Sequence, residues 1–189
     1  MPRVALLLAE GFEEGEALTV ADILRRAGME ADLVSIAGEN VRGGHDIEVV
    51  ADTLLPDSLL EYGMVVLPGG LPGATNLRDD DRVVTAVREM YDEGRWVTSI
   101  CAAAMVLGKA GVLDGHEWTS YPGYEAKIET TGTFSERLVV RDRTLITSRG
   151  PASAYAFGYA LVDALGGDSE AVKSRMVYRN AFDEIEESN

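Results

Sequence analysis

Short apolar runs that alternate with amphipathic stretches constrain the fold of this sequence more than any other feature. The clearest runs are rich in valine, isoleucine and leucine and lie at Val4 to Leu8, Met64 to Leu67 and Trp96 to Ile100. The stretches at 13–27 and 82–93 have the apolar spacing of helices, and each is followed by glycine. Parallel strands that helices cover on both faces have this pattern. The sequence therefore predicts an α/β fold, a three-layer sandwich with a mostly parallel central sheet.

The shorter elements predicted along the rest of the chain complete one domain. They are a strand at 31–36, a hairpin around 47–50 opened by Gly43-Gly44, short strands at 118–120, 138–140 and 145–147, and a helix at 153–165 after Pro151. No repeat, linker or low-complexity segment interrupts the 189 residues, and a domain of that length can bury a core. We therefore expect a single domain over 1–189, with a frayed acidic tail at 183–189.

Composition places the chain among ordinary globular proteins. Hydrophobic residues make up 46% and charged residues 26%, which is far from the composition of a disordered chain. The first apolar run, Val4 to Leu8, is too short for a signal peptide or a membrane span. A single cysteine cannot form an internal disulfide, so we expect its thiol in a reducing compartment. These features predict a cytoplasmic protein.

The formal net charge of −15 indicates which classes of partner the protein is not expected to bind. Only three of the 17 basic residues are lysines, Lys109, Lys127 and Lys173, and arginine supplies the rest. Such a surface repels nucleic acid and anionic lipid headgroups, so we expect neither a nucleic-acid nor a membrane partner. Two interpretations of the carboxylates stay open. The surface is either an ordinary acidic one, or a halophilic adaptation to a cytoplasm of molar salt, where screening removes self-repulsion.

The only cysteine of the chain lies where a buried strand runs directly into a helix-forming stretch. The segment Trp-Val-Thr-Ser-Ile-Cys-Ala-Ala-Ala places Cys101 between them, which is the geometry of a nucleophile elbow. The crowded positions on either side of such a turn hold the small Ser99 and Ala103. A helix N-terminus favours a thiolate, so the sequence predicts a lowered thiol pKa. The alternative, a small buried hydrophobe like most free cysteines, stays open.

A glycine-rich loop follows another predicted strand and is expected beside the cysteine. Pro68-Gly69-Gly70-Leu71-Pro72-Gly73 lies at the carboxyl end of that strand, where ligands bind in open α/β sheets. The backbone N–H of Gly70 can then join that of Ala102 in an oxyanion hole. The same glycines can instead make only a tight turn. No phosphate-loop lysine follows them.

The two histidines, His45 and His116, lie in predicted loops, where we expect both to be exposed. Zinc and iron sites in proteins are usually built from several cysteine, histidine or carboxylate ligands. This sequence has no second cysteine and no clustered histidines. We therefore expect neither a metal site nor a cofactor.

Four segments in combination carry a resemblance to a known family. They are Glu13-Glu14-Gly15-Glu16 leading to 22–28; Leu67-Pro68-Gly69-Gly70 with Gly73-Ala74 and Asn76-Leu77; Ile100-Cys101-Ala102; and Thr147-Ser148-Arg149-Gly150-Pro151. In this order and spacing the chain resembles the ThiJ/PfpI superfamily, in the branch of the parkinsonism-associated deglycase and its bacterial relatives. The resemblance extends over nearly the full length.

The resemblance implies a flavodoxin-like sandwich with a defined active site. Cys101 is then the reactive thiol, and Glu16 is a carboxyl group held protonated against it; the alternative for Glu16 is a surface carboxylate at the helix dipole. The resemblance also implies a homodimer that packs the first helix, with Arg26 near a shared active-site mouth. Tyr121 and His45 join Arg26 as candidate substrate-binding residues.

Departures from the family pattern reduce the number of activities expected for this chain. By the resemblance, members with well-developed glyoxalase activity have a Cys-His-Glu arrangement, with the histidine twenty residues after the cysteine. Here that position is Tyr121, and a phenol is a poor general base at neutral pH. In the peptidase branch histidine follows the cysteine, whereas here Ala102 does, which argues against proteolysis. The glutamine amidotransferases need a later histidine, and none follows His116.

The sequence thus favours a cysteine-dependent stress-response protein acting on α-oxoaldehydes or their early glycation adducts, a glyoxalase or deglycase. The alternative from another class is a redox sensor or chaperone in which Cys101 is oxidised. A third possibility, a binding module that keeps the fold without reactivity, is suggested by Tyr121.

Overall fold

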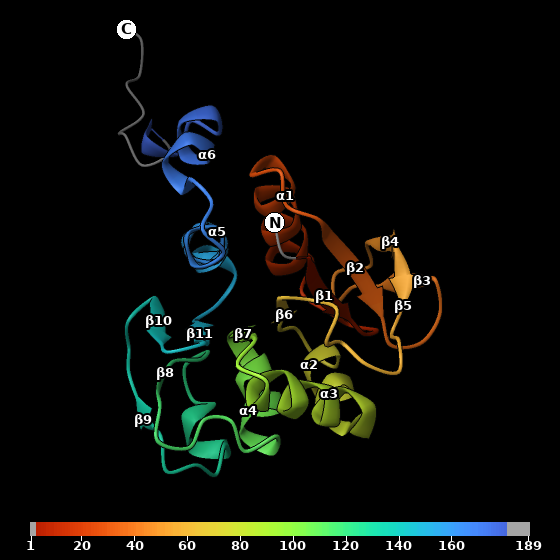
Figure 1. The fold of residues 1–189 in the computed structure, drawn as a ribbon. Coiled ribbons are helices and arrows are strands. Elements are labelled where there is room, and N and C mark those ends of the chain that lie inside the picture. The colour runs from red at the N-terminus through yellow and green to blue at the C-terminus, as the bar shows by residue number, and fades with distance from the viewer. Residues whose placement is uncertain (1–2, 181–189) are drawn as a thin grey trace, which may run out of the picture.

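A seven-stranded sheet forms the centre of the computed structural model, which describes residues 3–180 (Figure 1). Its strand order is β10-β11-β7-β6-β1-β2-β5. All neighbouring pairs are parallel except the antiparallel pair of β10 and β11. The strands are β1 (Val4–Leu8), β2 (Ala31–Ser35), β5 (Thr53–Leu54), β6 (Met64–Leu67), β7 (Trp96–Ile100), β10 (Val139–Asp142) and β11 (Leu145–Ser148). The predicted α/β class with a mostly parallel sheet is confirmed.

Helices cover both faces of this sheet (Figure 1). They are α1 (Glu14–Arg26), α2 (Gly73–Asp79), α3 (Asp81–Asp92), α4 (Ala104–Lys109), α5 (Ala154–Ala164) and α6 (Ser169–Arg175). α1 packs against α5, and α2, α3 and α4 pack together. The first pair lies close because α5 has a glycine at the contact. A Cβ on Gly158 would lie 2.8 Å from Cδ1 of Ile23.

The two layers of helices explain why the inner strands are apolar throughout. All five residues of β1 and all four residues of β6 are buried, as expected for parallel strands with no solvent face. On α1 the buried apolar residues Ala17, Val20, Ile23 and Leu24 follow the period of a helix. No helix among residues 3–180 is long and apolar enough to cross a membrane.

Within the described part of the chain, two small sheets and four short 3₁₀ segments lie outside the main sheet. A hairpin joins β3 (Asn40–Arg42) to β4 (Glu48–Val50), and β8 (Glu117–Trp118) pairs with β9 (Thr133–Phe134). The 3₁₀ segments are Cys101–Ala103, Glu125–Lys127, Pro151–Ser153 and Tyr178–Asn180. The predicted hairpin is confirmed, and the strand predicted at 118–120 ends earlier, at Trp118. The expected frayed tail at 183–189 lies outside the described residues.

Helices α2 and α6 were not predicted from the sequence. α2 begins at Gly73, directly after a proline, so its first residues have the composition of a turn. α6 does carry a signal, because the side chain of Asp168 caps it by accepting a hydrogen bond from the N–H of Ala171. At seven residues each, both helices are too short for a clear apolar period.

The carboxyl ends of β1, β6 and β7 lie side by side, because these strands are neighbours and parallel. The segments that follow them therefore meet at one edge of the sheet. Gly69 follows β6 and Cys101 follows β7, so the topology brings the glycine-rich loop next to the cysteine. Ligands bind at this edge in open α/β sheets.

Candidate active site

Cys101 occupies a strained elbow between β7 and a 3₁₀ turn that leads into α4. Its φ is +61°, a left-handed conformation that residues other than glycine rarely adopt and that clusters at functional sites. The crowded neighbours Ser99 and Ala103 are both fully buried. The elbow geometry predicted from the sequence is therefore present.

Glu16 is a fully buried carboxyl group in the first turns of α1. The backbone N–H of Gly69 donates a 2.7 Å hydrogen bond to its Oε2. Its Oε1 has no hydrogen-bond partner among residues 3–180. The alternative interpretation, a surface carboxylate at the helix dipole, is wrong because none of the side chain is exposed.

Gly69 lies between the sulfur and this carboxyl group. A Cβ on Gly69 would come within 2.6 Å of Cβ of Cys101, 3.1 Å of its Sγ and 2.8 Å of Oε2 of Glu16. No side chain fits there, because contacts under about 3 Å are repulsive. The glycine is required so that the thiol and the carboxyl group can approach one another.

The two groups shift each other's proton affinity. Burial raises the pKa of Glu16 from its ordinary 4.5 to about 7, although the Gly69 N–H and the thiol oppose the shift. Burial, and secondly the negative charge of Glu16, raise the pKa of Cys101 to about 12, while the backbone N–H groups of Ala102 and Gly70 lower it. While Glu16 is ionised, the lowered thiol pKa predicted from the helix N-terminus is therefore wrong in direction, because removal from water and the neighbouring charge outweigh the favourable dipoles.

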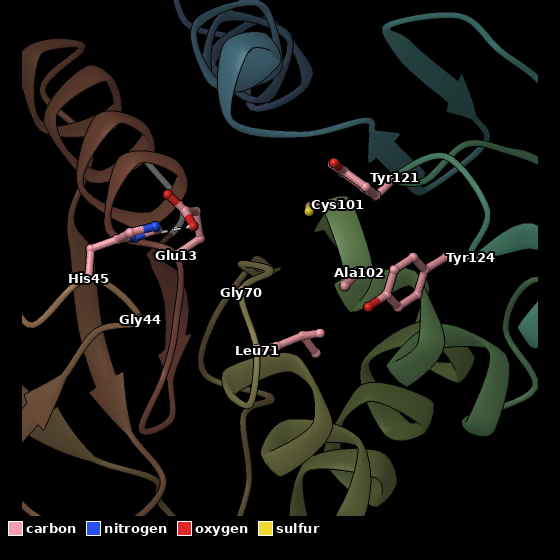
Figure 2. Close-up of a pocket in the computed structure, with 9 residues that line it drawn as sticks. All are labelled: Glu13, Gly44, His45, Gly70, Leu71, Cys101, Ala102, Tyr121 and Tyr124. Carbon is pink, nitrogen blue, oxygen red and sulfur yellow. Dashed lines mark ion pairs between the residues drawn. The ribbon is translucent and has the colours of Figure 1, made fainter.

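A cavity of about 300 Å³ opens in front of the sulfur. It is lined by Glu13, Gly44, His45, Gly70, Leu71, Cys101, Ala102, Tyr121 and Tyr124. Figure 2 shows Glu13 and His45 on one side of it, with Tyr121, Tyr124 and the cysteine opposite. Cys101 is buried, with 9% of its surface exposed, yet it faces this space. A small molecule can therefore reach the thiol.

The predicted oxyanion-hole residues lie at this cavity. Gly70 has φ +87°, and a Cβ there would meet the backbone nitrogen of Glu13 at 2.4 Å, so glycine serves a close backbone approach rather than only a turn. The backbone N–H groups of Ala102 and Gly70 lower the pKa of the Cys101 thiol, so both favour negative charge on the sulfur. An oxygen that becomes attached next to the sulfur lies within reach of the same donors.

Two tyrosines form the wall opposite His45. The backbone N–H of Tyr121 donates to the carbonyl of Cys101 at 3.3 Å, and its ring lies edge-on to that of Tyr124, with 6.2 Å between centroids. The Tyr121 residue is 46% exposed at the mouth. Tyr124 was not predicted from the sequence, because it lies in an irregular segment directly before a 3₁₀ turn and belongs to no motif.

Arg26 does not line the cavity in the single chain. It lies at the far end of α1, about 15 Å along the helix from Glu16, and its side chain donates to Asp22 at 2.8 Å. Its expected place near the active-site mouth therefore depends on a second copy of the chain.

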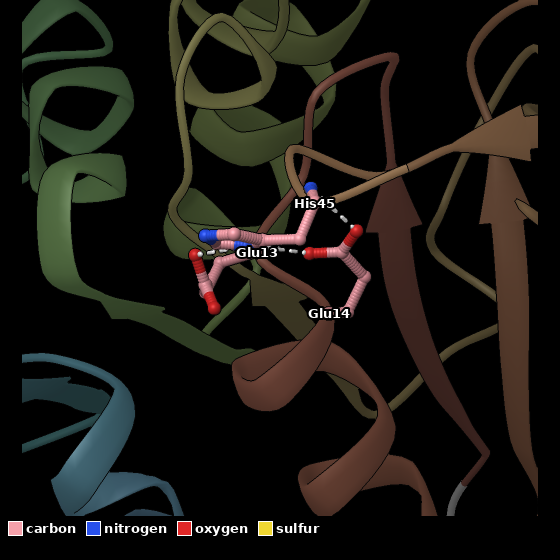
Figure 3. A group of neighbouring side chains, drawn as sticks. All are labelled: Glu13, Glu14 and His45. Carbon is pink, nitrogen blue, oxygen red and sulfur yellow. Dashed lines mark hydrogen bonds and ion pairs between the residues drawn. The ribbon is translucent and has the colours of Figure 1, made fainter. Parts of the chain in front are cut away.

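His45 belongs to a cluster with Glu13 and Glu14 (Figure 3). Its Nδ1 lies 2.9 Å from Oε2 of Glu14, whose Oε1 accepts from the backbone N–H groups of His45 and Ile47. These contacts raise the pKa of His45, chiefly through the hydrogen bond to Glu14. One ligand atom from each of the three side chains lies within 4.8 Å of the others, so among the described residues this group could hold a cation. The bonds within it already satisfy Glu14.

His116 was expected in an exposed loop, and this expectation is wrong. The residue is 2% exposed. Its Nε2 lies 2.8 Å from the hydroxyl of Tyr91, and its Nδ1 lies 3.2 Å from a carboxylate oxygen of Asp142. It does not line the cavity in front of Cys101. The hydroxyl of Tyr91 replaces water at Nε2, whereas Nδ1 lies close to Asp142 without a hydrogen-bond partner among residues 3–180.

The fold and the site together define a class: flavodoxin-like proteins with a cysteine on a strand-to-helix elbow beside a buried glutamate. The model of the DJ-1/PfpI family matches residues 2–164. The chain belongs to the DJ-1/PfpI family.

Individual relatives agree with this assignment. The chain is 35% identical over 181 residues to Protein dj-1beta of Drosophila melanogaster, covering 93% of this chain and 97% of the relative. It is 32% identical over 160 residues to a deglycase of Pyrococcus horikoshii, covering 82% and 94%. The solved structure of oxidized Toxoplasma gondii DJ-1 superposes with a TM-score of 0.86 at 28% identity, covering 94% and 98%. The predicted family is confirmed.

The raised pKa of Glu16 predicts a specific dependence of stability on pH. The native protein favours the protonated carboxyl, so this contribution to stability is complete below pH 4.5 and is lost as the pH rises to about 7. For a fully buried group the loss is about 3 kcal/mol. Glu16→Gln removes the titration but keeps an acceptor for Gly69.

Urea unfolding of both proteins between pH 4.5 and 8 measures this difference. The wild type should lose about 3 kcal/mol relative to the variant across that window. Glu30→Gln, at a surface position with 74% of its side chain exposed, is the matched control and should follow the wild type. Parallel curves for the wild type and Glu16→Gln would mean that Glu16 titrates normally.

Proposed function

We propose that the protein is a cysteine-dependent enzyme acting on α-oxoaldehydes or their early glycation adducts. The observation that carries this proposal is the contact between the Cys101 thiol and the buried Glu16 carboxyl at an open cavity. A nucleophile and an acid of raised pKa are what carbonyl addition with proton transfer requires. A relative named as a deglycase supports the same chemistry.

The sharing of one proton makes the sulfur nucleophilic. The pair loses its first proton near pH 7 and the second only near 12. Between these values the N–H groups of Ala102 and Gly70 favour a thiolate, whereas Oε1 of Glu16 has no donor among residues 3–180. An ionised buried oxygen without a donor is costly. We therefore assign the remaining proton to the Glu16 carboxyl group and the negative charge to the sulfur.

The first chemical step is addition of the thiolate to the aldehyde carbon. A carbon–sulfur bond forms, and the carbonyl electrons move onto the oxygen, which the N–H groups of Gly70 and Ala102 stabilise. Glu16 then donates its proton to this oxygen. The product is a hemithioacetal on Cys101, and Glu16 becomes the carboxylate that acts as base in the next step.

The second step moves hydrogen between the two adjacent carbons. The Glu16 carboxylate removes the proton from the former aldehyde carbon and returns it to the neighbouring carbon, while the hydroxyl proton passes to the neighbouring oxygen. The first carbon is thereby oxidised and the second reduced, so no external oxidant is needed. Water attacks the resulting thioester and gives one proton to the Glu16 carboxylate, the carbon–sulfur bond breaks so that Cys101 leaves as the thiolate, and the product is a 2-hydroxy acid.

Tyr121 makes this chemistry slow rather than absent. A histidine in its place could accept protons near neutral pH, but a phenol, whose ordinary pKa is about 10, can only donate a hydrogen bond there. Its ring lines the cavity close to the cysteine. In this proposal Tyr121 binds substrate with His45, and Glu16 alone transfers protons.

A second candidate function is redox sensing, which a solved relative in an oxidized state favours. Peroxide would oxidise the Cys101 thiolate first to the sulfenate and then to the sulfinate, releasing one water at each step. The N–H groups of Ala102 and Gly70 and the protonated Glu16 would hydrogen-bond the added oxygens. The same proton sharing supports both functions.

We also propose that the protein is a homodimer through α1 and works in the cytoplasm. The outer side of α1 carries Gly15, Leu18, Thr19, Asp22 and Arg26 at helical spacing, and each is exposed or half-buried. A second copy packed there could bring its Arg26 towards the cavity of the first.

Substitutions of the proton-sharing pair test the enzymatic proposal. Cys101→Ser should abolish turnover of methylglyoxal, and Glu16→Gln should lower kcat/KM by at least about 100-fold, since it removes the general acid and base. Glu30→Gln at the surface should leave kcat/KM unchanged. Turnover that survives in both site variants would eliminate the proposal.

Tyr121→His should increase activity, because it supplies a second proton-transfer group at the cavity. We expect kcat with methylglyoxal to rise by on the order of 10-fold, whereas Tyr121→Phe should stay within a few-fold of the wild type. If Tyr121→Phe is as inactive as Cys101→Ser, the phenol itself takes part in proton transfer and its assigned role is wrong.

Intact-mass measurement after limited exposure to hydrogen peroxide tests the redox function. The wild type should gain the two oxygens of a sulfinate on Cys101. Glu16→Gln should form the sulfinate more slowly, because the sulfur then has no carboxyl partner to hold the proton. A thiol that stays unmodified in the wild type would reject redox sensing.

A further inference from the structure

A second cavity, of about 340 Å³, lies beside the first and is lined by basic side chains. We call it the basic cavity. Its lining residues are Arg78, Met105, Gly108, Lys109, Tyr124, Lys127, Ile128 and Glu129. Three cations therefore face a space that holds one carboxylate.

The positive charge of the basic cavity is opposite in sign to the net charge of the whole chain. The formal net charge is −15, and the sequence contains only three lysines. Two of them, Lys109 and Lys127, line the basic cavity. A concave site whose charge is opposite to that of the molecule focuses the field for an anion.

The cations are incompletely neutralised by their neighbours. The ammonium of Lys127 lies 4.4 Å from the ring centroid of Tyr124 and has no carboxylate partner among residues 3–180. Lys109 lies 3.7 Å from an oxygen of Asp81, whose side chain is 95% exposed, so this pair is weak. Arg78 alone is closely paired, with Asp79 at 2.7 Å. The two lysines are thus available to a ligand.

Tyr124 lines both cavities, so they are neighbours separated by one side chain. A second link is the chain itself, which runs from Cys101 through one 3₁₀ turn and α4 to Lys109. Eight residues of helix span about 12 Å. A ligand that reacts at Cys101 and reaches the lysines must therefore extend about that far, which excludes methylglyoxal itself.

We propose that the basic cavity is a subsite for an acidic side chain of a glycated peptide. Three or four extended residues span about 12 Å. An aspartate or glutamate three or four positions from the glycated residue therefore reaches Lys109 and Lys127 while the adduct lies at Cys101. This proposal rests on the proposed function, because it names the substrate class of the same site. The apolar surfaces of Met105, Tyr124 and Ile128 would contact the intervening peptide.

Steady-state kinetics with matched adducts test the subsite. The substrates are methylglyoxal hemithioacetals of two cysteine peptides, with aspartate or asparagine three residues after the cysteine. The wild type should show a KM about 5-fold lower for the aspartate peptide, with similar kcat, as expected for two partly screened ion pairs. Lys109→Gln/Lys127→Gln should lose this preference. Lys173→Gln, which changes the remaining lysine of the sequence, on α6, should keep the preference for the aspartate peptide.

A binding measurement keeps this inference separate from the enzymatic proposal. Inorganic phosphate added to the wild type should shift the backbone amide NMR signals of Tyr124 to Ile128, and the double variant should show no such shift. If the wild type has no turnover, these shifts still test the subsite. If turnover occurs but phosphate causes no shift and the two peptides have equal KM values, the subsite is wrong. A preference for glycated mononucleotides over both peptides would overturn the peptide assignment.

Discussion

A carboxyl group buried against a thiol is the interaction on which the rest of the site depends. Glu16 has no exposed surface, and one of its oxygens is held by the N–H of Gly69 at 2.7 Å. Burial raises its pKa to about 7, so the carboxyl can hold a proton at the pH at which its neighbour Cys101 reacts. Any side chain on Gly69 would separate the two groups. Proton sharing thus requires a fully buried acid and a bare backbone between it and the sulfur.

The fold supplies these conditions through parallel strands that end at one edge. The carboxyl end of β6 presents Gly69 and Gly70, and the end of β7 presents Cys101 in a left-handed conformation. The helix α1, which covers one face of the sheet, contributes Glu16. The site is therefore made of three segments far apart in the sequence. The rigid sheet fixes their separation, and the hairpin histidine and the two tyrosines complete the walls.

The sequence predicted those features that depend on local pattern. Buried strands, the elbow and the glycine-rich loop have clear periods or small residues at fixed positions, and all are present. The predicted direction of the thiol pKa was wrong for a thiol beside an ionised Glu16, because the helix dipole can be inferred from sequence whereas burial and the neighbouring charge cannot. His116 is buried through contacts with Tyr91 and Asp142, which lie 25 and 26 residues away in sequence. Tyr124 lines two cavities for similarly non-local reasons.

The titration of the Cys101 thiol tests the central claim most directly. Because the chain has a single cysteine, the ultraviolet absorbance of the thiolate reports on this sulfur alone. If the remaining proton resides on Glu16, the thiolate signal appears with a midpoint near pH 7 and is complete well below pH 9. A signal that appears only above the ordinary thiol pKa of about 8.5 would place the proton on sulfur and contradict the account.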